Sequence, residues 1–397
     1  MVDFTLTEQQ LEWQQKAREF GANELRPLAM QRDQNPDPEQ AFDVELYQKG
    51  LALGLQKTCI PKKFDGLGLD CLTHTLIWEE LGAAEAGFAV SMQAQAWAIT
   101  MLLNMGTQQQ CETWLKPIVD GGLAVISAVE PETGAAVPMY DPMNFAFKTT
   151  AHRDGDDWVL NGYKTFAGNA GTPLTSWLYI LARTDDKQTG MPAHSFFLVE
   201  PDNPGLKVGN NMDKMGHRTA HTPPLTLVDL RVPSSALVGG VTGMPQPPGA
   251  RQSTADSFLV VGAIGLGIAR ALYEEALKFT QQRQAAGKPM IQHQMITARL
   301  ADMYIAIEGA RALLWKAAWF TDNNPQSDTK LSLAAKVTCT DAAARISRDA
   351  LQLFGGYGYT KEALIEKLYR DAKAPEWYEG ANESLRIALG QYIDWGV

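Results

Sequence analysis

The chain has 397 residues, of which 45% are hydrophobic and 20% charged, and its formal net charge is −10. This length suffices for two or three domains around a large hydrophobic core. The negative charge argues against a nucleic-acid partner, which normally requires a basic face, but permits a phosphorylated ligand held by a few arginines or helix N-termini.

Residues 1–120 are predicted to form an N-terminal helical domain. Thr7 followed by Gln10 is a capping-box pattern for the first helix. The spacing of apolar residues indicates further helices in three segments: 43–57, 72–84 and 87–105.

Residues 121–240 are predicted to form a middle β domain of the sandwich or barrel type. Short runs rich in β-branched and aromatic residues indicate strands at 124–129, 145–151, 158–166, 177–183 and 195–200. Asp154-Gly155 and Asn161-Gly162 are typical of hairpins or turns. We therefore expect a compact β domain between two helical ones.

Residues 241–397 are predicted to form a C-terminal four-helix bundle, which makes the fold class α+β. Apolar residues of the segment 292–320 alternate spacings of four and three, as in one face of a bundle helix: Ile296, Leu300, Met303, Ile307, Ala310, Leu314 and Ala317. A second helix, from about residue 327 to 353, is expected to end at the glycines of GGYGY (355–359).

Cysteines and histidines show no pattern of a metal or redox site. The four cysteines are widely scattered: Cys59, Cys71, Cys111 and Cys339. His217 and His221 are close in sequence, but the glycine and prolines around them oppose the helix that would bring both to one metal ion. We expect no metal.

The N-terminal sequence MVDFTLTEQQ shows neither a signal-peptide nor a transit-peptide pattern. The longest apolar run, 258–269, is too short to span a bilayer. These features predict a cytoplasmic protein without a membrane span.

The strongest candidate for chemistry is Glu379, which follows Trp377 and Tyr378 and precedes Gly380. A carboxylate in desolvated, aromatic surroundings has a raised pKa and can act as a general base near neutral pH. Glu379 could equally be a surface or salt-bridged carboxylate. The Gly-rich segment 355–359 could approach a phosphate or ribose closely, or simply end a helix.

Five ordered segments resemble the acyl-CoA dehydrogenase family. They are EPETG (130–134), NGYKTFAGNA (161–170), KMGHR running on to LVDLRVP (214–233), RQAAGKP ending in HQ (283–294), and QLFGGYGYTKEALIEKLYRDAKAPEWYEGANESLR (352–386). Five motifs in order are far more specific than any single motif. The resemblance extends over nearly the whole chain, which is identified as a member of that family.

The resemblance implies a homotetramer that holds FAD between subunits. Residues 124–135 and 166–168 would contact the isoalloxazine ring, and Arg283 would reach the FAD pyrophosphate of a neighbouring subunit. The implied cofactor-binding residues are Val129, Gly134, Ala135, Phe166, Gly168, Arg283, His293, Gln294, Gln352, Gly355, Gly356, Ala381 and Glu383.

The resemblance also implies the reaction, which is α,β-dehydrogenation of an acyl-CoA with electrons passed to an electron-transferring flavoprotein. Glu379 would remove the α proton while the β hydride goes to flavin N5, and the backbone N–H of Glu379 would stabilise the enolate. Some family members carry the base on a helix near Ala255 instead, and alanine cannot act as one.

Several family hydroxyl groups are replaced in this chain. Where the family usually has threonine, serine and threonine, the chain has Val129, Ala135 and Gly168, and Phe166 replaces a tryptophan. Each missing hydroxyl could remove about 1 kcal/mol of flavin or ligand binding. Ordinary divergence, with water or backbone replacing the contacts, is one interpretation; altered chemistry or an unusual substrate is the other.

Gln93 and Trp97, together with Tyr378 and Gly380, are the candidate substrate residues. Trp97 would either belong to the core or shorten the acyl pocket. Gln93 would suit a polar acyl group. We therefore expect a short, polar or bulky acyl group.

Other functions stay open on the sequence alone. The same fold could catalyse enoyl-CoA reduction, a lyase or desulfinase-like cleavage, or an oxidase reaction. A non-catalytic binding or assembly protein is a further alternative, against which the retained Arg283 and Gln352 argue.

Overall fold

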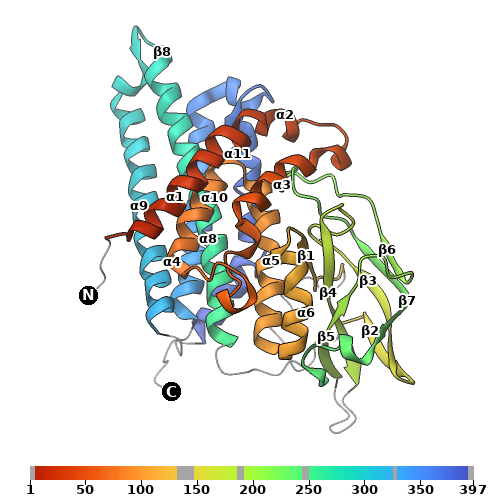
Figure 1. Cartoon of the computed structure of the whole chain (residues 1–397). Coiled ribbons are helices and arrows are strands. Elements are labelled where there is room, and N and C mark those ends of the chain that lie inside the picture. Colours follow the sequence, from red (N-terminus) through yellow and green to blue (C-terminus); the bar gives the residue numbers. More distant parts are fainter. Residues whose placement is uncertain (1–4, 132–146, 186–191, 244–249, 325–328, 392–397) are drawn as a thin grey trace.

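The computed structural model describes residues 5–131, 147–185, 192–243, 250–324 and 329–391. Helices come first, a curled sheet follows, and long helices complete the molecule (Figure 1). This order confirms the predicted fold class.

The N-terminal part consists of six α-helices: α1 (Glu8–Phe20), α2 (Ala29–Asp33), α3 (Val44–Leu53), α4 (Cys71–Ala84), α5 (Ala86–Met105) and α6 (Gln108–Val119). The capping box of α1 is confirmed, because the Thr7 hydroxyl accepts from the Gln10 N–H at 3.3 Å and the Gln10 side chain accepts from the Thr7 N–H at 2.9 Å. Helix α4 is buried almost throughout and α5 over about half of its length, and both pack against α8.

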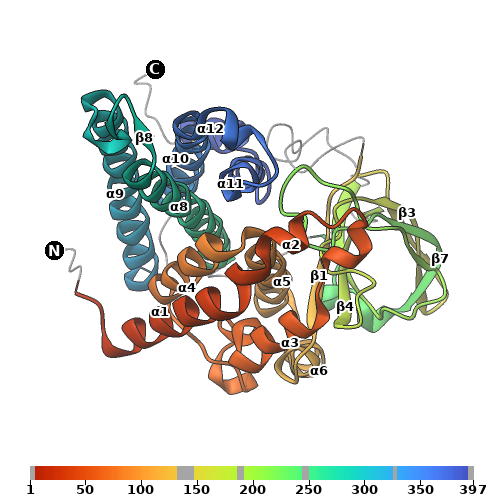
Figure 2. The same cartoon turned by 90° about the horizontal axis from the view of Figure 1, so that it is seen from above.

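The middle part is one sheet of seven strands: β1 (Leu123–Ser127), β2 (Thr150–Asp154), β3 (Asp157–Lys164), β4 (Thr175–Asp185), β5 (Pro192–Val199), β6 (Leu206–Val208) and β7 (Leu225–Pro233). The strands lie in the order β1-β4-β2-β3-β7-β6, and β5 pairs with β4. Two clusters of buried apolar residues pack against the sheet. One of these clusters also includes residues of α5 and α6. Strand β1 lies beside α5, whereas β3 and β7 lie on the side of the sheet away from the helices (Figure 2).

One of the two turn predictions in this region is confirmed and the other is wrong. Asp154-Gly155 lies in the β2–β3 hairpin, where Asp154 pairs with Asp157. Asn161-Gly162 instead lies inside β3, where the register with β7 shifts between Leu160 and Gly162. Pairing on both edges keeps this segment in the sheet. A Cβ at Gly162 would lie 2.5 Å from the Thr149 hydroxyl, so the glycine permits close strand contact.

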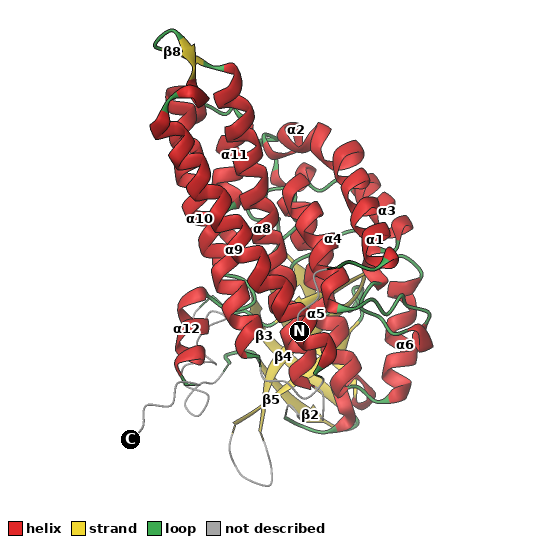
Figure 3. Ribbon diagram, turned by 90° about the vertical axis from the view of Figure 1, so that its left-hand side faces the viewer, coloured by secondary structure: helices red, strands yellow, loops and turns green. Residues whose placement is uncertain are grey.

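The C-terminal part contains α8 (Ala250–Gln282), α9 (Gln294–Asn323), α10 (Lys330–Phe354), α11 (Leu364–Asp371) and α12 (Asn382–Gly390), with a hairpin of β8 (Gln284–Ala285) and β9 (Lys288–Pro289) between α8 and α9. The heptad prediction for α9 is confirmed, since six of its seven residues are buried in the largest core cluster. Helix α4 of the N-terminal part lies beside α8 and α9 and packs against both (Figures 2 and 3).

In the part of the chain that the structure describes, two helices are long and apolar enough to cross a membrane by composition alone. They are α5 and the part of α8 from Asp256 to Gln282. Within the fold, 61% and 83% of their apolar windows are buried. We therefore interpret both as core helices.

Candidate active site

Glu379 lies in a tight turn between a short 3-10 helix (η10, Ala374–Glu376) and α12. Its backbone adopts a left-handed conformation with φ 52°, and Gly380 follows with φ 90°. Such a conformation costs a non-glycine residue about 1 kcal/mol or more, so the surrounding structure must hold it in place. Residues with this kind of strain occur preferentially at functional sites.

Glu379 is half-buried as a residue, but its carboxyl group lies in a desolvated position that prepares it for proton transfer. Burial raises the pKa of its carboxyl group to about 7, against opposing effects of the Ser257 hydroxyl and the Lys336 charge. Ser257 on α8 donates a hydrogen bond to Glu379 Oε2 at 3.1 Å. A carboxylate with a pKa near 7 suits a general base at neutral pH.

Side chains of α10 bind the turn that contains Glu379 and Gly380, which is called the base turn below. The Lys336 ammonium group donates to the Gly380 carbonyl oxygen at 2.9 Å and to Asn382 Oδ1 at 2.7 Å. Asn382 in turn donates to the Thr340 hydroxyl at 2.9 Å and to Asp341 Oδ1 at 2.8 Å. These contacts connect the C-terminal side of the turn, at Gly380 and Asn382, to a core helix.

Tyr378 and His217 lie on one side of the base turn. Their rings are 5.9 Å apart between centroids, and both side chains carry a buried polar atom without a hydrogen-bond partner among the described residues. Burial lowers the pKa of His217, so its imidazole is neutral at pH 7. A buried hydroxyl and a buried imidazole nitrogen without partners are available to a bound polar ligand.

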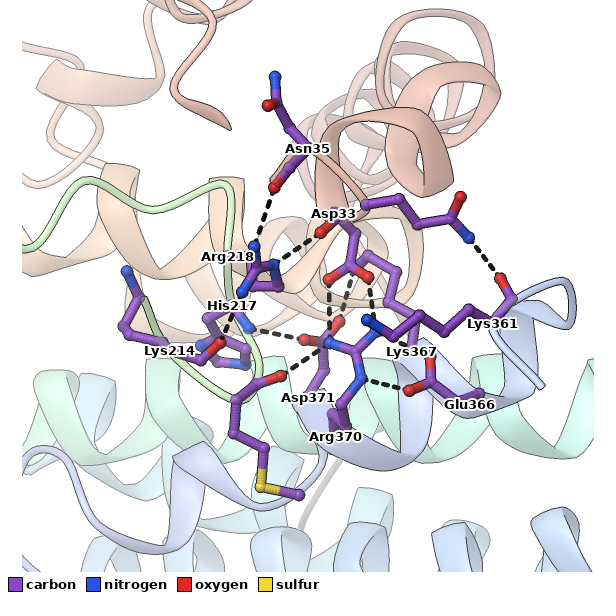
Figure 4. A network of polar contacts seen from close by, with 12 residues as sticks. Asp33, Asn35, Lys214, His217, Arg218, Lys361, Glu366, Lys367, Arg370 and Asp371 are labelled. Carbon is purple, nitrogen blue, oxygen red and sulfur yellow. Dashed lines mark hydrogen bonds and ion pairs between the residues drawn. The ribbon is translucent and has the colours of Figure 1, made fainter. Parts of the chain in front are cut away.

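A network of buried charges supports this region from the side of the N-terminal helices (Figure 4). Lys367 on α11 contacts Glu85 at 2.6 Å and Asp371 at 2.5 Å, and the Asp371 carboxylate accepts from the backbone N–H of His217 at 2.7 Å. Beside it, Arg370 binds both carboxylate oxygens of Asp33, at 3.1 and 2.5 Å. The network therefore joins α2, the α4–α5 junction, the segment 214–219 and α11.

The two predicted flavin segments of the β domain are held together by a buried ion pair. Glu130 and Lys164 contact each other at 2.8 Å, and both are almost fully buried. Glu130 also accepts from the backbone N–H groups of Lys148 and Thr149 at 2.7 and 2.9 Å. The Val129 carbonyl accepts from the Thr165 N–H at 2.9 Å, so the segment after β1 and the segment after β3 lie side by side.

The described residues of these segments fit the planar ring of a flavin. Phe166 is left-handed with φ 55° and is 55% exposed, and a Cβ at Gly168 would meet a single neighbour, Ala94 at 3.9 Å. The buried side-chain oxygens of Ser127 and Asn169 have no partner among the described residues. An exposed ring, open backbone and unsatisfied oxygens suit a bound aromatic, polar group. Gly134 and Ala135 lie outside the described residues.

The residues predicted to bind the remainder of the dinucleotide gather at the other end of the long helices. Arg283 is exposed at the start of the β8–β9 hairpin, and Gly355, with φ 58°, and Gly356 have open space where a Cβ would lie. A cleft of about 480 Å³ here is lined by Met290, Met295, Ile296, Arg299, Arg348, Asp349, Gln352 and Leu353. Two arginines, Arg299 and Arg348, were missed by the sequence analysis.

The contacts of His293 and Gln294 differ from each other. The His293 Nε2 atom lies 2.9 Å from the Ala285 carbonyl oxygen, which closes the hairpin. Gln294 is exposed at the first position of α9. Ala381 precedes α12 and Glu383 is exposed in its first turn.

The two sets of predicted cofactor residues lie far apart within one chain. Lys336, beneath the base turn, and Gln352, in the cleft, are separated by 16 residues of α10, or about 24 Å along the helix axis. The cleft residues Met290 and Met295 follow directly after the β8–β9 hairpin. The β8 end of the long helices is opposite to the end that carries α12 (Figure 3). This separation favours a dinucleotide held between two subunits.

The predicted substrate residues lie in different surroundings. Gln93 is buried and its amide nitrogen has no partner among the described residues. Trp97 packs its ring against Phe196 of β5 at 5.8 Å, as expected of a core residue between α5 and the sheet. Gln95 also has a structural contact, because its side chain accepts from the Ala124 N–H of β1 at 3.4 Å.

Two residues that contact the base region were not found from the sequence. On α8, Ser257 contacts Glu379. Ser257 lies two positions beyond Ala255, and the side chain of Ala255 is not among those that the structure describes. Lys336 had a usable signal, since it is a single charge in the apolar segment LSLAAKVTC (331–339). A lone lysine in the buried stripe of a helix requires a polar partner.

Comparison with known proteins agrees with this arrangement. Models of the acyl-CoA dehydrogenase N-terminal, middle and C-terminal domains match residues 7–122, 127–230 and 254–393. The short-chain specific acyl-CoA dehydrogenase of Rattus norvegicus mitochondria is 34% identical over 99% of this chain and 91% of its own length.

Solved structures show the same likeness. Butyryl-CoA dehydrogenase of Megasphaera elsdenii has 31% identity and a TM-score of 0.87, covering 98% of this chain and 99% of its own. The prolyl acyl carrier protein oxidase AnaB has 27% identity and a TM-score of 0.86 with the same coverage. Enzymes of this kind are FAD-dependent oxidoreductases that act on CH–CH groups. The chain belongs to the acyl-CoA dehydrogenase family.

Proposed function

We propose that the protein catalyses α,β-dehydrogenation of a short, polar or bulky acyl-CoA, with Glu379 as the base. The observation that carries this proposal is the buried Glu379 carboxyl group, whose pKa is raised to about 7 and which receives a hydrogen bond from Ser257 at 3.1 Å. Among the described residues, no cation lies within ion-pair distance of this carboxylate. It is therefore free to take up a proton.

Each part of the base turn has a role in this reaction. Glu379 accepts the α proton on a carboxylate oxygen, and burial of the site excludes water and strengthens polar contacts to the thioester. The backbone N–H of Glu379 has no acceptor within hydrogen-bonding geometry among the described residues, which leaves it for the thioester carbonyl oxygen. FAD, when bound, supplies the acceptor for the β hydride.

The residues in and next to the segments that follow β1 and β3 would hold the flavin ring. Ser127, Phe166 and Asn169 would contact the ring, and Gly168 leaves space for it. Arg283 with Gln352, Gly355 and Gly356 would bind the dinucleotide of a neighbouring subunit. The arginines Arg299 and Arg348 add positive charge to the same cleft.

The acyl group is proposed from two buried polar atoms, one on the residue before the base and one on α5. The Tyr378 hydroxyl and the Gln93 amide nitrogen are buried without partners among the described residues, which favours a ligand with polar groups over a long hydrocarbon chain. The relatives named for short-chain acyl-CoA and butyryl-CoA support a short chain. A panel of acyl-CoAs of increasing length and polarity tests this, and activity confined to long unbranched chains would contradict it.

The assembly is proposed to be a homotetramer that passes electrons to an electron-transferring flavoprotein. The outer face of α9 exposes large apolar side chains, with Met295 at 74% and Ile305 at 66% exposure, which suits contact with another copy. Light scattering on the purified protein measures the mass, and Ile305→Glu is expected to lower it. A wild-type monomer would contradict the assembly.

An oxidase reaction is the second candidate. Val129 and Gly168 stand where the family usually has threonines beside the flavin, and the similar AnaB is named an oxidase. Oxygen consumption during turnover, compared with reduction of an electron-transferring flavoprotein, separates the two.

Anaerobic titration of the purified yellow protein with acyl-CoAs tests the main proposal. Bleaching of the flavin band by one acyl class, absent in Glu379→Gln, supports dehydrogenation by this base. A flavin that no acyl-CoA reduces would contradict it.

A further inference from the structure

Lys336 is a fully buried lysine whose ammonium group contacts no carboxylate within 4 Å among the described residues. Its acceptors are two neutral oxygens, the Gly380 carbonyl and the Asn382 amide, at 2.9 and 2.7 Å. A buried charge without an ion-pair partner is energetically unfavourable. Burial accordingly lowers the pKa of Lys336 to about 8, and the carboxylate of Glu379 acts most strongly in the opposite direction. The lysine therefore carries an energetic cost that an apolar side chain would avoid.

Both acceptors belong to the turn that carries the base. The Gly380 carbonyl follows directly after left-handed Glu379, and Asn382 begins α12. A neutral donor in the same position would complete the same hydrogen bonds, so the contacts explain why a donor is present but not why it is charged. The charge requires a group that responds to it.

Among the described residues, the carboxylates that most strongly raise the pKa of this lysine are Glu379, Asp341, Glu376 and Glu383. Three of them have other surroundings. Asp341 contacts Asn382 and Arg386, Glu376 contacts Lys373 at 2.5 Å, and Glu383 is exposed to solvent. From α8, Gly262 packs against the Lys336 backbone and Ser257 offers a hydroxyl to the base. Among the described residues, Glu379 is therefore the carboxylate in this group that is desolvated and has no cation in contact.

We propose that Lys336 is a positioning residue for the base: its buried ammonium group fixes the left-handed turn of Glu379 and Gly380 and supplies the positive charge that keeps the base in its carboxylate form. The geometry separates the two groups enough that the base stays free. A direct contact would lock the carboxylate as an ion pair, whereas a charge one peptide unit away opposes desolvation without occupying a carboxylate oxygen.

This inference rests on the proposed function, because it assumes that Glu379 is the base. It assigns a role to a residue that would not touch substrate or flavin. The role has two separable parts, a hydrogen bond that holds the turn and a charge that favours the carboxylate. Variants that keep one part and remove the other distinguish them.

The test compares Lys336→Met, Lys336→Gln and Lys336→Arg in the FAD-loaded protein, with the rate of anaerobic flavin bleaching measured against pH. Lys336→Met is expected to lower the maximal rate at least tenfold and to move the pH midpoint upward by about one unit, on the scale of a nearby opposite charge. Lys336→Gln should keep more of the rate but show the same upward movement. Lys336→Arg should restore a midpoint near that of the wild type.

Lys214→Met is the matched control. The Lys214 ammonium group also donates to backbone carbonyls, at 2.8 Å to Ala220 and 3.4 Å to Met212, and burial also lowers its pKa to about 8. It lies on the 214–219 segment rather than beneath the base turn. Its removal should leave the pH midpoint unchanged.

Asn382→Asp is a second test, which applies if the variants of buried Lys336 do not fold. This variant keeps the lysine and places a carboxylate against it, which neutralises its charge, so the pH midpoint should again move upward. Folded variants of Lys336, or folded Asn382→Asp, with wild-type midpoint and rate would overturn the inference. An active Glu379→Gln would instead overturn the proposed function, so the two failures are distinguishable.

Discussion

Lys367 and Lys336 are two of the buried lysines that the structure describes, and the difference between their contacts separates a scaffold from a reactive site. Lys367 contacts Glu85 at 2.6 Å and Asp371 at 2.5 Å. Although burial alone would raise the pKa of Glu85, the Lys367 ammonium group holds it below its ordinary value. Lys336 contacts the Gly380 carbonyl instead of a carboxylate, and the pKa of neighbouring Glu379 is raised to about 7.

The comparison shows that contact geometry, more than residue type, decides what a buried carboxylate can do. A direct ion pair fixes the charge of Glu85 and Asp371 and joins three regions of the chain, but leaves no affinity for a proton near neutral pH. Separation by one peptide unit leaves Glu379 able to gain and lose a proton. Changes at the two sites should therefore affect different properties, stability at one and reactivity at the other.

The largest expected effect is on activity. Glu379→Gln should lower the rate of flavin reduction by acyl-CoA about 10³-fold, the scale of a lost general base. Stopped-flow bleaching measures the rate, and the flavin content of the variant should match that of the wild type. Retention of a tenth or more of the wild-type rate would show that another group takes the proton.

The next effect is on stability. Lys367→Met should lower the free energy of unfolding by about 3–5 kcal/mol, because it leaves two buried carboxylates without their cation. Chemical denaturation measures the change. Lys49→Met is the control, since the Lys49–Glu24 pair at 2.7 Å is exposed and its loss should leave the unfolding midpoint unchanged. Equal effects of the two variants would contradict a structural role for the buried network.

A third effect links the base to the pH dependence of stability. The folded pKa of Glu379, about 7, lies above its ordinary value of 4.5. The native state therefore binds an extra proton between these values, and this contribution to stability is present below pH 4.5 and is lost as pH rises through 7. Glu379→Gln should not show this decrease in the free energy of unfolding, which amounts to about 3 kcal/mol at most in the wild type.

Denaturation of both proteins at pH 5 and pH 8 measures this difference. We expect the variant to gain stability relative to the wild type at pH 8 when the two are compared with their values at pH 5. Parallel pH dependence of the two proteins would mean that Glu379 is not a desolvated carboxylate.

The smallest effect concerns Ser257. Removing its hydrogen bond in Ser257→Ala should raise the pKa of Glu379 and move the pH midpoint of flavin reduction upward by about one unit or less, as expected for one bond to a charged acceptor. Ser347→Ala is the control, because the Ser347 hydroxyl binds the Ala344 carbonyl within α10 at 2.8 Å. A midpoint that moves equally in both variants would exclude a specific effect of Ser257.

Much of the fold followed from periodic patterns along the sequence. The α9 heptad, the capping box of α1 and the hairpin at Asp154-Gly155 are local features, and all three are confirmed. Asn161-Gly162 was misread as a turn because pairing of β3 with neighbours on both sides overrides the local preference. Only the assembled sheet contains that information.

The site was predictable to a different degree. Glu379 was found because its motif is contiguous in sequence, whereas Ser257 and Lys336 come from helices distant in sequence, and helical spacing alone does not show which faces meet. For Trp97 the sequence allowed two roles, in the acyl pocket or in the core. The contact of its ring with Phe196 shows the core role. Contacts between elements, rather than patterns within them, define this site.

The pH dependence of anaerobic flavin reduction by a short-chain acyl-CoA tests the central claim most directly, namely that burial tunes Glu379 as the base. The rate should rise with pH through a midpoint near 7, the value to which burial raises the pKa of this carboxyl group, and this rise should be absent in Glu379→Gln. A midpoint near the ordinary carboxyl value of 4.5, or a rate independent of pH, would contradict the claim.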